Sequence, residues 1–278
     1  MNRKHHMTAG CFFSRLLLVV LLLLTFFPLL VMINMSLKQS VMITNDFFGL
    51  PRFLYWQNYQ KAFVFVIRPI GNSIYICVIS LIGILIMVSL SGYALGKMKF
   101  KGRNFVYMAI MAVMMIPYTL LIVPNYNIVS DMGLLNTFWS VIIPYMSGQQ
   151  IFGIIIAESF YRELPKDIFE AARIDGANDI QLFAKVALPL SKPILITVGI
   201  TAVVAMYNDY IWPTITITSG DELKTFCQIV FNNAAGKGSN DLGLIAASFV
   251  IGAIPLLVAT SSCLKYYVQG MMVGSVKG

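Results

Sequence analysis

The chain has 278 residues, of which 58% are apolar and only 12% carry a charge, and its mean hydropathy is +0.77. Soluble domains usually contain about a quarter charged residues, so this balance excludes an ordinary soluble protein and predicts a membrane protein. The net charge of +8 does not indicate nucleic-acid binding, because basic residues also gather beside membrane spans, where they meet anionic lipid.

The N-terminal region predicts a short cytoplasmic tail, residues 1–13, and a first span at Ser14–Met35. A basic stretch before an apolar run is also how a secretory signal begins. Here no small-x-small cleavage site follows, and the run continues through Val31-Met32-Ile33. We therefore expect an uncleaved span.

Further apolar runs follow along the chain, each close to the 20 or so residues that a helix needs to cross a hydrocarbon core of about 30 Å. These predicted spans are Asn72–Gly96, Phe105–Tyr126, Phe138–Ala157, Leu188–Ile211 and Leu242–Leu264. Together with the first span they predict an all-α polytopic membrane domain over residues 14–265, which a cytoplasmic tail follows at residues 266–278.

The basic residues orient these spans. Most of the 20 lysines and arginines fall on one side of the predicted membrane, in the two tails, in the Lys97–Arg103 loop and in the Glu158–Pro193 segment. The positive-inside rule therefore places both termini and these two segments in the cytoplasm.

The predicted spans contain prolines but no deeply placed ionisable residue. Pro117, Pro124, Pro144 and Pro255 should kink the third, fourth and sixth spans. Carriers that use an ion gradient usually bury ionisable groups on their path, and here Asp209, near the outer end of the fifth span, comes closest. An ion-coupled carrier and a membrane-embedded enzyme are therefore not expected.

The cysteines and histidines indicate neither a disulfide framework nor a reactive centre. Cys77 and Cys263 fall in predicted spans and Cys11 in the N-terminal tail, so Cys227 is expected to be the one thiol reachable from outside. The sequence has no metal-ligand cluster and no phosphate-binding glycine-rich loop. Catalytic residues, a metal site and a cofactor site are therefore not expected on this chain.

A polar connection at about residues 158–188 separates the fourth and fifth predicted spans. Pro165 can open a helix there, Gly176 is placed to end it in the left-handed conformation, and Asn178 with Gln181 predicts a capping box that opens a second helix. The apolar face of this second helix is expected at Ile180, Phe183, Ala184 and Val186. The connection thus predicts a helix–turn–helix on which a cytoplasmic partner can dock.

The spacing of this connection resembles a known pattern. Glu170-Ala171-Ala172, then Gly176, then Leu188-Pro189 is similar to the coupling loop in permease subunits of binding-protein-dependent ABC importers. Further stretches resemble the carbohydrate branch of that family, and the maltose-type permeases in particular: Gly92-Tyr93-Ala94-Leu95, Gly133-Leu134-Leu135-Asn136-Thr137, Tyr207-Asn208-Asp209-Tyr210-Ile211-Trp212-Pro213 and the tail Tyr267–Gly278.

This resemblance implies a non-catalytic transport subunit in the cytoplasmic (inner) membrane of a prokaryote. It implies as partners a second permease in a heterodimer, two copies of a cytoplasmic ATPase and an external solute-binding protein. ATP and Mg²⁺ would bind the ATPase, and this chain would bind no cofactor. The residues that the resemblance implies for ATPase coupling are Glu170, Ala171, Ala172, Asp175, Gly176, Ala177, Phe183, Leu188 and Pro189.

Residues for a solute path are harder to choose. Amides and aromatic rings bind sugars, and the candidates are Gln149, Gln150, Tyr207, Asn208, Asp209 and Trp212. Amides in a span also serve as interhelical hydrogen-bond partners, and aromatic residues near its end also anchor it at the membrane interface. The solute itself stays open between a sugar and another solute such as an amino acid or peptide. A membrane receptor or scaffold that docks a partner through the same loop is the alternative from another class.

Overall fold

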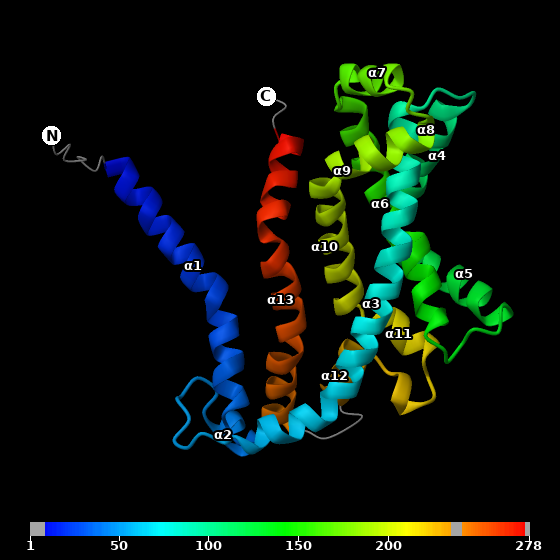
Figure 1. Cartoon of the computed structure of the whole chain (residues 1–278). Helices are drawn as coiled ribbons and strands as arrows, with labels where there is room; N and C mark the ends of the chain where they lie inside the picture. Colours follow the sequence, from blue (N-terminus) through cyan, green and yellow to red (C-terminus); the bar gives the residue numbers. More distant parts are fainter. Residues whose placement is uncertain (1–8, 235–240, 276–278) are drawn as a thin grey trace. The chain divides into compact units, whose positions relative to one another are not determined.

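The computed structural model describes residues 9–234 and 241–275, with side chains described for residues 13–234 and 241–265. This part of the chain contains helices and loops and no strand, so the predicted all-α class is confirmed (Figure 1). The uninterrupted apolar runs explain this, because a backbone in lipid must satisfy its own hydrogen bonds and a helix does so locally.

Four helices are each long and apolar enough to cross a membrane: α1 (Ala9–Ser36), α3 (Gln57–Lys97), α6 (Trp139–Glu163) and α13 (Leu242–Ser275). Two bent pairs bring the number to as many as six, if each pair is one span. The first pair is α4 (Arg103–Met114) with α5 (Tyr118–Asp131), and the second joins the helical stretch from α8 (Asp179–Gln181) to α9 (Leu188–Leu190) with α10 (Lys192–Asn208).

The predicted third span, Phe105–Tyr126, is broken rather than merely kinked. The helices α4 and α5 meet at an angle of 100°. Pro117 lies at the break and has an extended ψ of 128°. Proline has no N–H to donate and disfavours helix at the residue before it, so α4 ends before Pro117. With 12 residues, α4 is about 18 Å long and cannot cross the hydrocarbon core alone.

The remaining elements are short. They are α2 (Ser40–Asn45), α7 (Lys166–Ile174), the π-helix η1 (Leu182–Ala187), α11 (Ile211–Thr216), the 3-10 turn η2 (Asp221–Leu223) and α12 (Phe226–Asn232).

The chain divides into two compact units, one comprising residues 1–67 with 232–253 and the other comprising residues 68–231 with 254–278. In the first unit, the buried Asn58 Nδ2 donates to the carbonyl oxygens of Ser36 (2.9 Å) and Lys38 (2.8 Å). Ser40 Oγ donates to Asp241 Oδ1 at 2.6 Å. Within this unit, these bonds tie the end of α1 to the start of α3 and the start of α2 to the residue before α13.

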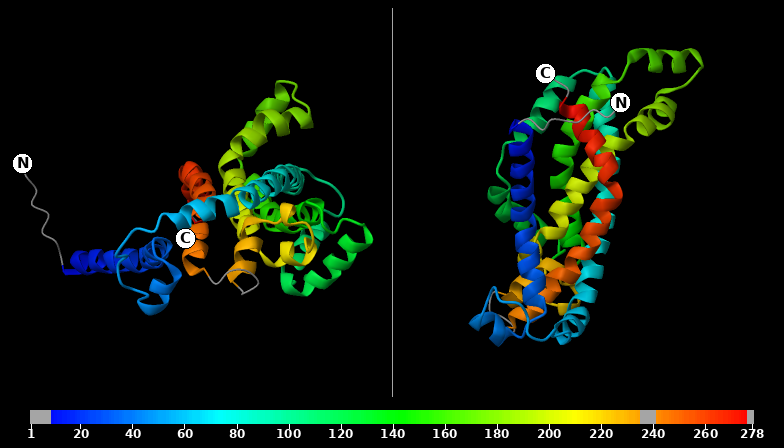
Figure 2. Two further views of the ribbon diagram at one scale, coloured as in Figure 1. Left: turned by 90° about the horizontal axis from the view of Figure 1, so that it is seen from below. Right: turned by 90° about the vertical axis from the view of Figure 1, so that its left-hand side faces the viewer.

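In the second unit, α6 packs between α3 and α10. A Cβ atom added at Gly92 of α3 would lie 2.6 Å from Ala157 Cβ, and one added at Gly153 of α6 would lie 2.6 Å from Val88 and 2.8 Å from Val198. Glycines at these places let the helix backbones approach closely, as is common in membrane bundles. The helix α7 and the turn that follows it project beyond the Glu163 end of α6 (Figure 2).

Candidate functional site

The polar connection after α6 has the local geometry that its sequence predicts. Gly176 is left-handed with φ +84°, its N–H donates to Arg173 O, and the N–H of Ala177 donates to Ala172 O, both at 3.0 Å. This pair of bonds is a Schellman motif, which satisfies the last carbonyls of α7. We call residues 164–191 the coupling segment.

The second helix of the coupling segment starts at the predicted capping box. Gln181 N donates to Asn178 Oδ1 at 2.9 Å, and Asn178 N donates to Gln181 Oε1 at 3.0 Å. Arg173 Nη2 also pairs with Asp179 Oδ1 at 3.2 Å across the turn. Both partners of this ion pair are exposed, so the pair adds little stability, and the two caps fix the turn.

The predicted apolar face of this second helix is partly wrong. Ile180 is 77% exposed and Ala184 is exposed, whereas Leu182 and Ala187 are fully buried. The reason is that residues 182–187 form a π-helix, in which residues five apart share a face. Phe183 and Val186 are half-buried, in partial agreement with the prediction.

An aromatic cluster anchors the coupling segment to α3 and α6. Tyr93 of α3 lies with its ring centroid 5.2 Å from that of Phe183, 5.7 Å from that of Tyr161 and 6.5 Å from that of the buried Phe169. Lys97 Nζ lies 4.8 Å from the Phe169 centroid and donates to Leu164 O at 2.7 Å. A second link joins Tyr161 Oη to Ser191 Oγ at 2.8 Å.

The opposite surface of the coupling segment is open and mixed in character. Of the residues assigned to ATPase coupling, Glu170, Ala171, Asp175, Gly176 and Pro189 are exposed, and Ala172, Ala177, Phe183 and Leu188 are half-buried. Ile174 is 87% exposed and Ile168 42%. The sequence did not single out Ile168 and Ile174, and it placed Ile180 on a buried face, although large apolar residues in a polar loop are a recognisable sign of a contact surface.

A cavity of about 510 Å³ opens between α4, α5, α6, α10 and the start of α11. Its polar lining includes Gln149, Asn208 and Asp209, which the sequence placed on a solute path, and Tyr118 and Tyr145, which it did not. Gln150, Tyr207 and Trp212 do not line this cavity. The size and the mixed apolar and amide lining suit a small polar ligand.

Asp209 joins the helices that border the cavity. Its Oδ1 accepts from the backbone N–H groups of Ile211 (2.9 Å) and Trp212 (3.3 Å), and its Oδ2 accepts from Tyr145 Oη (3.0 Å). The carboxylate therefore caps α11 and ties α10 to α6 at the cavity wall.

Tyr207 and Trp212, which the sequence placed on the solute path, are buried in the structure and do not line the cavity. Trp212 is fully buried and its Nε1 donates to Ser140 O at 2.9 Å. The buried Tyr207 is stacked on Phe226 with ring centroids 5.7 Å apart, and Tyr210 is stacked on Phe231 at 4.1 Å. The physical reason is that α11 folds against α6, so Trp212 fills the interior, whereas Tyr210 and Phe231 stay 38% and 40% exposed.

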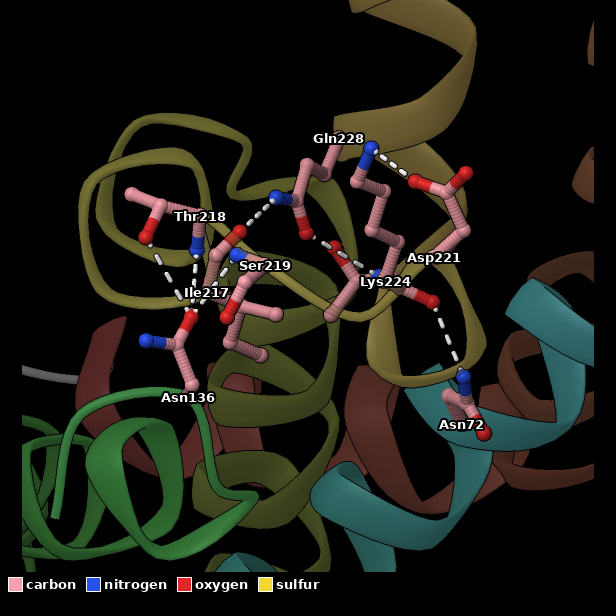
Figure 3. A network of polar contacts seen from close by, with 9 residues as sticks. Asn72, Asn136, Ile217, Thr218, Ser219, Asp221, Lys224 and Gln228 are labelled. Atoms are coloured by element: carbon pink, nitrogen blue, oxygen red, sulfur yellow. Dashed lines mark hydrogen bonds and ion pairs between the residues drawn. The ribbon is translucent and has the colours of Figure 1, made fainter.

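Amide side chains hold the loops around α11, and we call residues 132–140 and 209–228 the polar cap (Figure 3). Asn136, with a left-handed φ of 58°, accepts through Oδ1 from the N–H groups of Thr218 and Ser219, both at 2.8 Å. The buried Gln228 donates through Nε2 to Ile217 O at 2.7 Å. Asn72 Nδ2 of α3 donates to Lys224 O at 3.0 Å. These long-range bonds fix the loop 217–225.

The expected accessibility of Cys227 is also wrong. Cys227 belongs to α12 and is 4% exposed, and burial, followed by the nearby Asp209 charge, raises the pKa of its thiol to about 11. Within the residues that the structure describes, no group of three or more His, Cys, Asp or Glu side chains could hold a metal ion.

Comparisons with known proteins agree on one family. The model of the family described as "Binding-protein-dependent transport system inner membrane component" matches residues 88–272. The chain is 31% identical over 212 residues to the arabinooligosaccharides transport system permease protein AraQ of Halalkalibacterium halodurans, with 75% of this chain and 73% of AraQ covered. It is 28% identical over 258 residues to the melibiose/raffinose/stachyose import permease protein MelC of Bacillus subtilis, with 91% and 92% covered.

One solved structure shows the same fold. It is a chain of a bacterial ABC transporter involved in the import of the acidic polysaccharide alginate, with a TM-score of 0.79 and 22% sequence identity. The match covers 96% of this chain and 99% of the other.

Proposed function

Because this chain belongs to the family of binding-protein-dependent transport system inner membrane components, we propose that it is the membrane-spanning permease subunit of an ATP-driven importer of a sugar or oligosaccharide. The sugar assignment is supported by relatives whose names specify arabinooligosaccharides and melibiose, raffinose or stachyose. The chain itself catalyses no reaction in this proposal, and ATP and Mg²⁺ bind a partner ATPase.

The observation that carries the proposal is the coupling segment. Two caps hold it in a fixed turn, its buried side is anchored on Tyr93, and its open side presents Glu170 with Ile174 and Ile180. A rigid, exposed, partly apolar element at the end of a membrane bundle is suited to bind a cytoplasmic subunit. We assign this surface to the ATPase.

The proposed topology has six spans with both termini in the cytoplasm. The bent pair α4 with α5 then counts as one span, and α10, which follows the coupling segment, is the fifth span. The membrane domain covers residues 14–265, the coupling segment lies on the cytoplasmic side, and the polar cap faces outward. Its partners are a second permease in a heterodimer, two ATPase copies and an external solute-binding protein.

Movement of the ATPase reaches the spans through the anchors of the coupling segment. A displacement of α7 acts on Phe169 and Tyr93, and a displacement of the turn after it acts through Ser191 on Tyr161 of α6. Because both paths end on helices that pack around Gly92 and Gly153, the motion can shift the bundle between two packings. Alternating access to the cavity then follows as a population shift between these packings.

The solute passes through the 510 Å³ cavity in this proposal. Gln149 and Asn208 are the hydrogen-bonding side chains, and Tyr118, which is 47% exposed, offers a ring face. An amino acid or a peptide is the alternative solute, since amide side chains also bind such groups. The external binding protein then selects between these solutes before they reach the cavity.

Reconstitution with the partner subunits tests the proposal. We expect labelled oligosaccharide to enter vesicles when ATP is present on the ATPase side and to continue entering after the ion gradients are collapsed. Glu170→Lys should abolish uptake and release the ATPase, because Glu170 is assigned a charge-assisted contact worth about 1.5–3 kcal/mol. Gln149→Ala should instead raise the solute concentration needed for half-maximal uptake and keep the ATPase bound.

The outcome separates the alternatives. Uptake by this chain alone, driven by an ion gradient, would contradict an ATP-driven permease. ATPase binding without any transport would support the docking scaffold. Transport of amino acids or peptides in place of saccharides would support the assignment as a permease and contradict the assignment of a sugar as its solute.

A further inference from the structure

The cavity between α4, α5, α6, α10 and α11 carries charge of one sign on the wall that this chain supplies. Most of that wall is apolar, and its polar side chains are Tyr118, Thr119, Tyr145, Gln149, Asn208 and Asp209. Among the residues that the structure describes, none of those that line the cavity is a lysine, an arginine or a histidine. Within this described lining, Asp209 is therefore the one charged side chain.

The surroundings of Asp209 favour its ionised form. The carboxylate accepts three hydrogen bonds, from the N–H groups of Ile211 (2.9 Å) and Trp212 (3.3 Å) and from Tyr145 Oη (3.0 Å). Donors that point at a carboxylate stabilise the charge over the neutral acid. None of the ion pairs found among the described residues includes Asp209, so its negative charge is not offset by a cation of this chain.

The charge of Asp209 acts throughout the cavity. A sphere of about 510 Å³ is roughly 10 Å across, and two like charges that far apart, at an effective dielectric constant of about 20, repel enough to weaken an affinity about tenfold. Charges in a partly buried, apolar site are screened by salt much less than charges in bulk water. A solute that carries a carboxylate therefore binds less tightly at any position in this cavity.

The same side chain can bind a hydroxyl group. A carboxylate offers about four lone-pair positions, and the three donors account for two on Oδ1 and one on Oδ2. Oδ2 can therefore accept one more hydrogen bond, which a sugar hydroxyl can donate and a carboxylate of the solute cannot. Hydrogen bonds to an ionised acceptor are about twice as strong as those between neutral groups. Gln149 and Asn208 are amides, which bind hydroxyls and carboxylates alike.

We propose that Asp209 is a specificity-determining residue of the solute path, which accepts uncharged saccharides and disfavours saccharides that carry carboxylate groups, such as those built from uronic acids. This inference rests on the proposed function, because it assigns the charge of the solute that enters the same cavity. The second permease adds side chains of its own to the path, but the repulsion from Asp209 acts on any solute in the part that this chain lines.

Saccharide binding to the assembled complex tests the inference. Both permeases and the ATPases are placed in nanodiscs without ATP and without the external binding protein, so that the membrane path alone selects. Two pairs of probes differ in having a carboxylate in place of a hydroxymethyl group: melibiose with its galacturonate counterpart, and galactobiose with digalacturonate. Titration followed by saturation-transfer NMR gives each Kd. We expect each acidic probe to bind about tenfold more weakly than its neutral counterpart.

Charge variants separate this role of Asp209 from a merely structural one. Asp209→Asn removes the charge and keeps a good helix-capping side chain, so the ratio of acidic to neutral Kd values should fall close to one. Asp209→Glu keeps the charge and should keep the ratio well above one. Glu158→Gln is the matched control, because Glu158 is an acid of α6 that does not line the cavity. It lies nine residues from Gln149, about 13 Å along the helix, so the ratio should not change.

The outcomes distinguish this inference from the proposed function. Equal Kd values for the acidic and neutral probes in the unchanged complex would overturn the inference and still support a saccharide permease. A ratio that stays high in Asp209→Asn would also overturn it, because another group would then select the charge. Loss of the ratio in both Asp209→Asn and Asp209→Glu would assign Asp209 a structural role only. If no probe of either kind bound, the solute path of the proposed function would be contradicted, and the inference with it.

Discussion

The two ends of α6 carry polar residues that act in opposite ways. Beyond Glu163, the bonds that form the turn at Gly176 and the capping box at Asn178 close within five residues, and the surface keeps Glu170 and Ile174 exposed. Around Trp139, in the polar cap, the bonds of Ser140 and Asn136 join residues 72 to 83 positions apart, and Trp212 is completely buried. The first end leaves an exposed surface on which the proposed ATPase can bind, whereas the bonds at the second end join distant parts of the chain to one another.

The largest loss of transport is expected from a change at Gly176, because the turn of the coupling segment depends on the backbone conformation of this one residue. Gly176→Val should abolish uptake and weaken ATPase binding, because a β-branched residue at φ +84° is strained by about 1–2 kcal/mol or more. No atom lies within 4 Å of a Cβ placed there, so the effect comes from the backbone and not from a clash. Co-purification of the ATPase and ATP-driven uptake measure it.

Gly176→Asn is the matched control, since asparagine tolerates the left-handed region. It should retain most of the uptake. Equal loss in the asparagine and valine variants would show that the open space beside Gly176 matters more than its conformation, and the partner would then have to fill that space.

The second effect lies in the polar cap and concerns stability. Trp212→Ala should destabilise the chain by about 3–5 kcal/mol, the usual cost of removing a large buried aromatic side chain. Trp212→Phe should cost about 1–3 kcal/mol, because it keeps most of the ring and leaves the buried Ser140 carbonyl without its donor. Thermal unfolding in detergent measures both changes in stability. If a Trp212 variant instead changed the affinity for the solute and kept its stability, Trp212 would have to contact the solute.

The same contrast explains what the sequence could reveal. Gly176 and the Asn178–Gln181 box follow local rules, because their partners lie within a few residues, and the structure reproduces both. The partner of Trp212 is Ser140, 72 residues away, and no local pattern indicates such a pairing. An aromatic-rich motif therefore suggested a sugar site where the structure has an interior contact.

The bends in the helices could be predicted from the sequence only in part. Pro117 predicted a kink, but the 100° angle between α4 and α5 depends on how both helices pack beside the cavity. The π-helix at Leu182–Ala187 is a similar case. It moved the buried face from Ile180 and Ala184 to Leu182 and Ala187, and a pattern search with a period of 3.6 residues cannot detect such a change.

A smaller loss of stability is expected at Asn136, whose side chain holds the loop 217–225 of the polar cap. Asn136→Gly keeps the left-handed backbone at φ 58° but removes the acceptor for Thr218 and Ser219. At about 0.5–1.5 kcal/mol for each lost hydrogen bond, the loop 217–225 should open locally with little effect on the rest of the bundle. Hydrogen exchange of these two amides measures the change.

Asn136→Asp preserves both the acceptor and tolerance of the left-handed conformation, so its exchange rates should stay close to those of the unchanged chain. Fast exchange in the aspartate variant would mean that the side-chain amide nitrogen, and not Oδ1, holds the loop.

The smallest effect is expected for chemical labelling of Cys227, which should hardly react. A membrane-impermeant maleimide should leave it unlabelled at pH 7, because the residue is 4% exposed and only the thiolate reacts. Burial raises the pKa of this thiol to about 11, so about one molecule in ten thousand is ionised at pH 7. The ionised fraction, and with it any residual rate, should rise about tenfold per pH unit until the pH approaches 11.

Ser219→Cys, at an exposed position of the same cap, should label rapidly from outside and so also report the orientation. Rapid labelling of Cys227 at pH 7 would show that α12 opens readily, and the polar cap could then no longer be regarded as the self-contained end of α6.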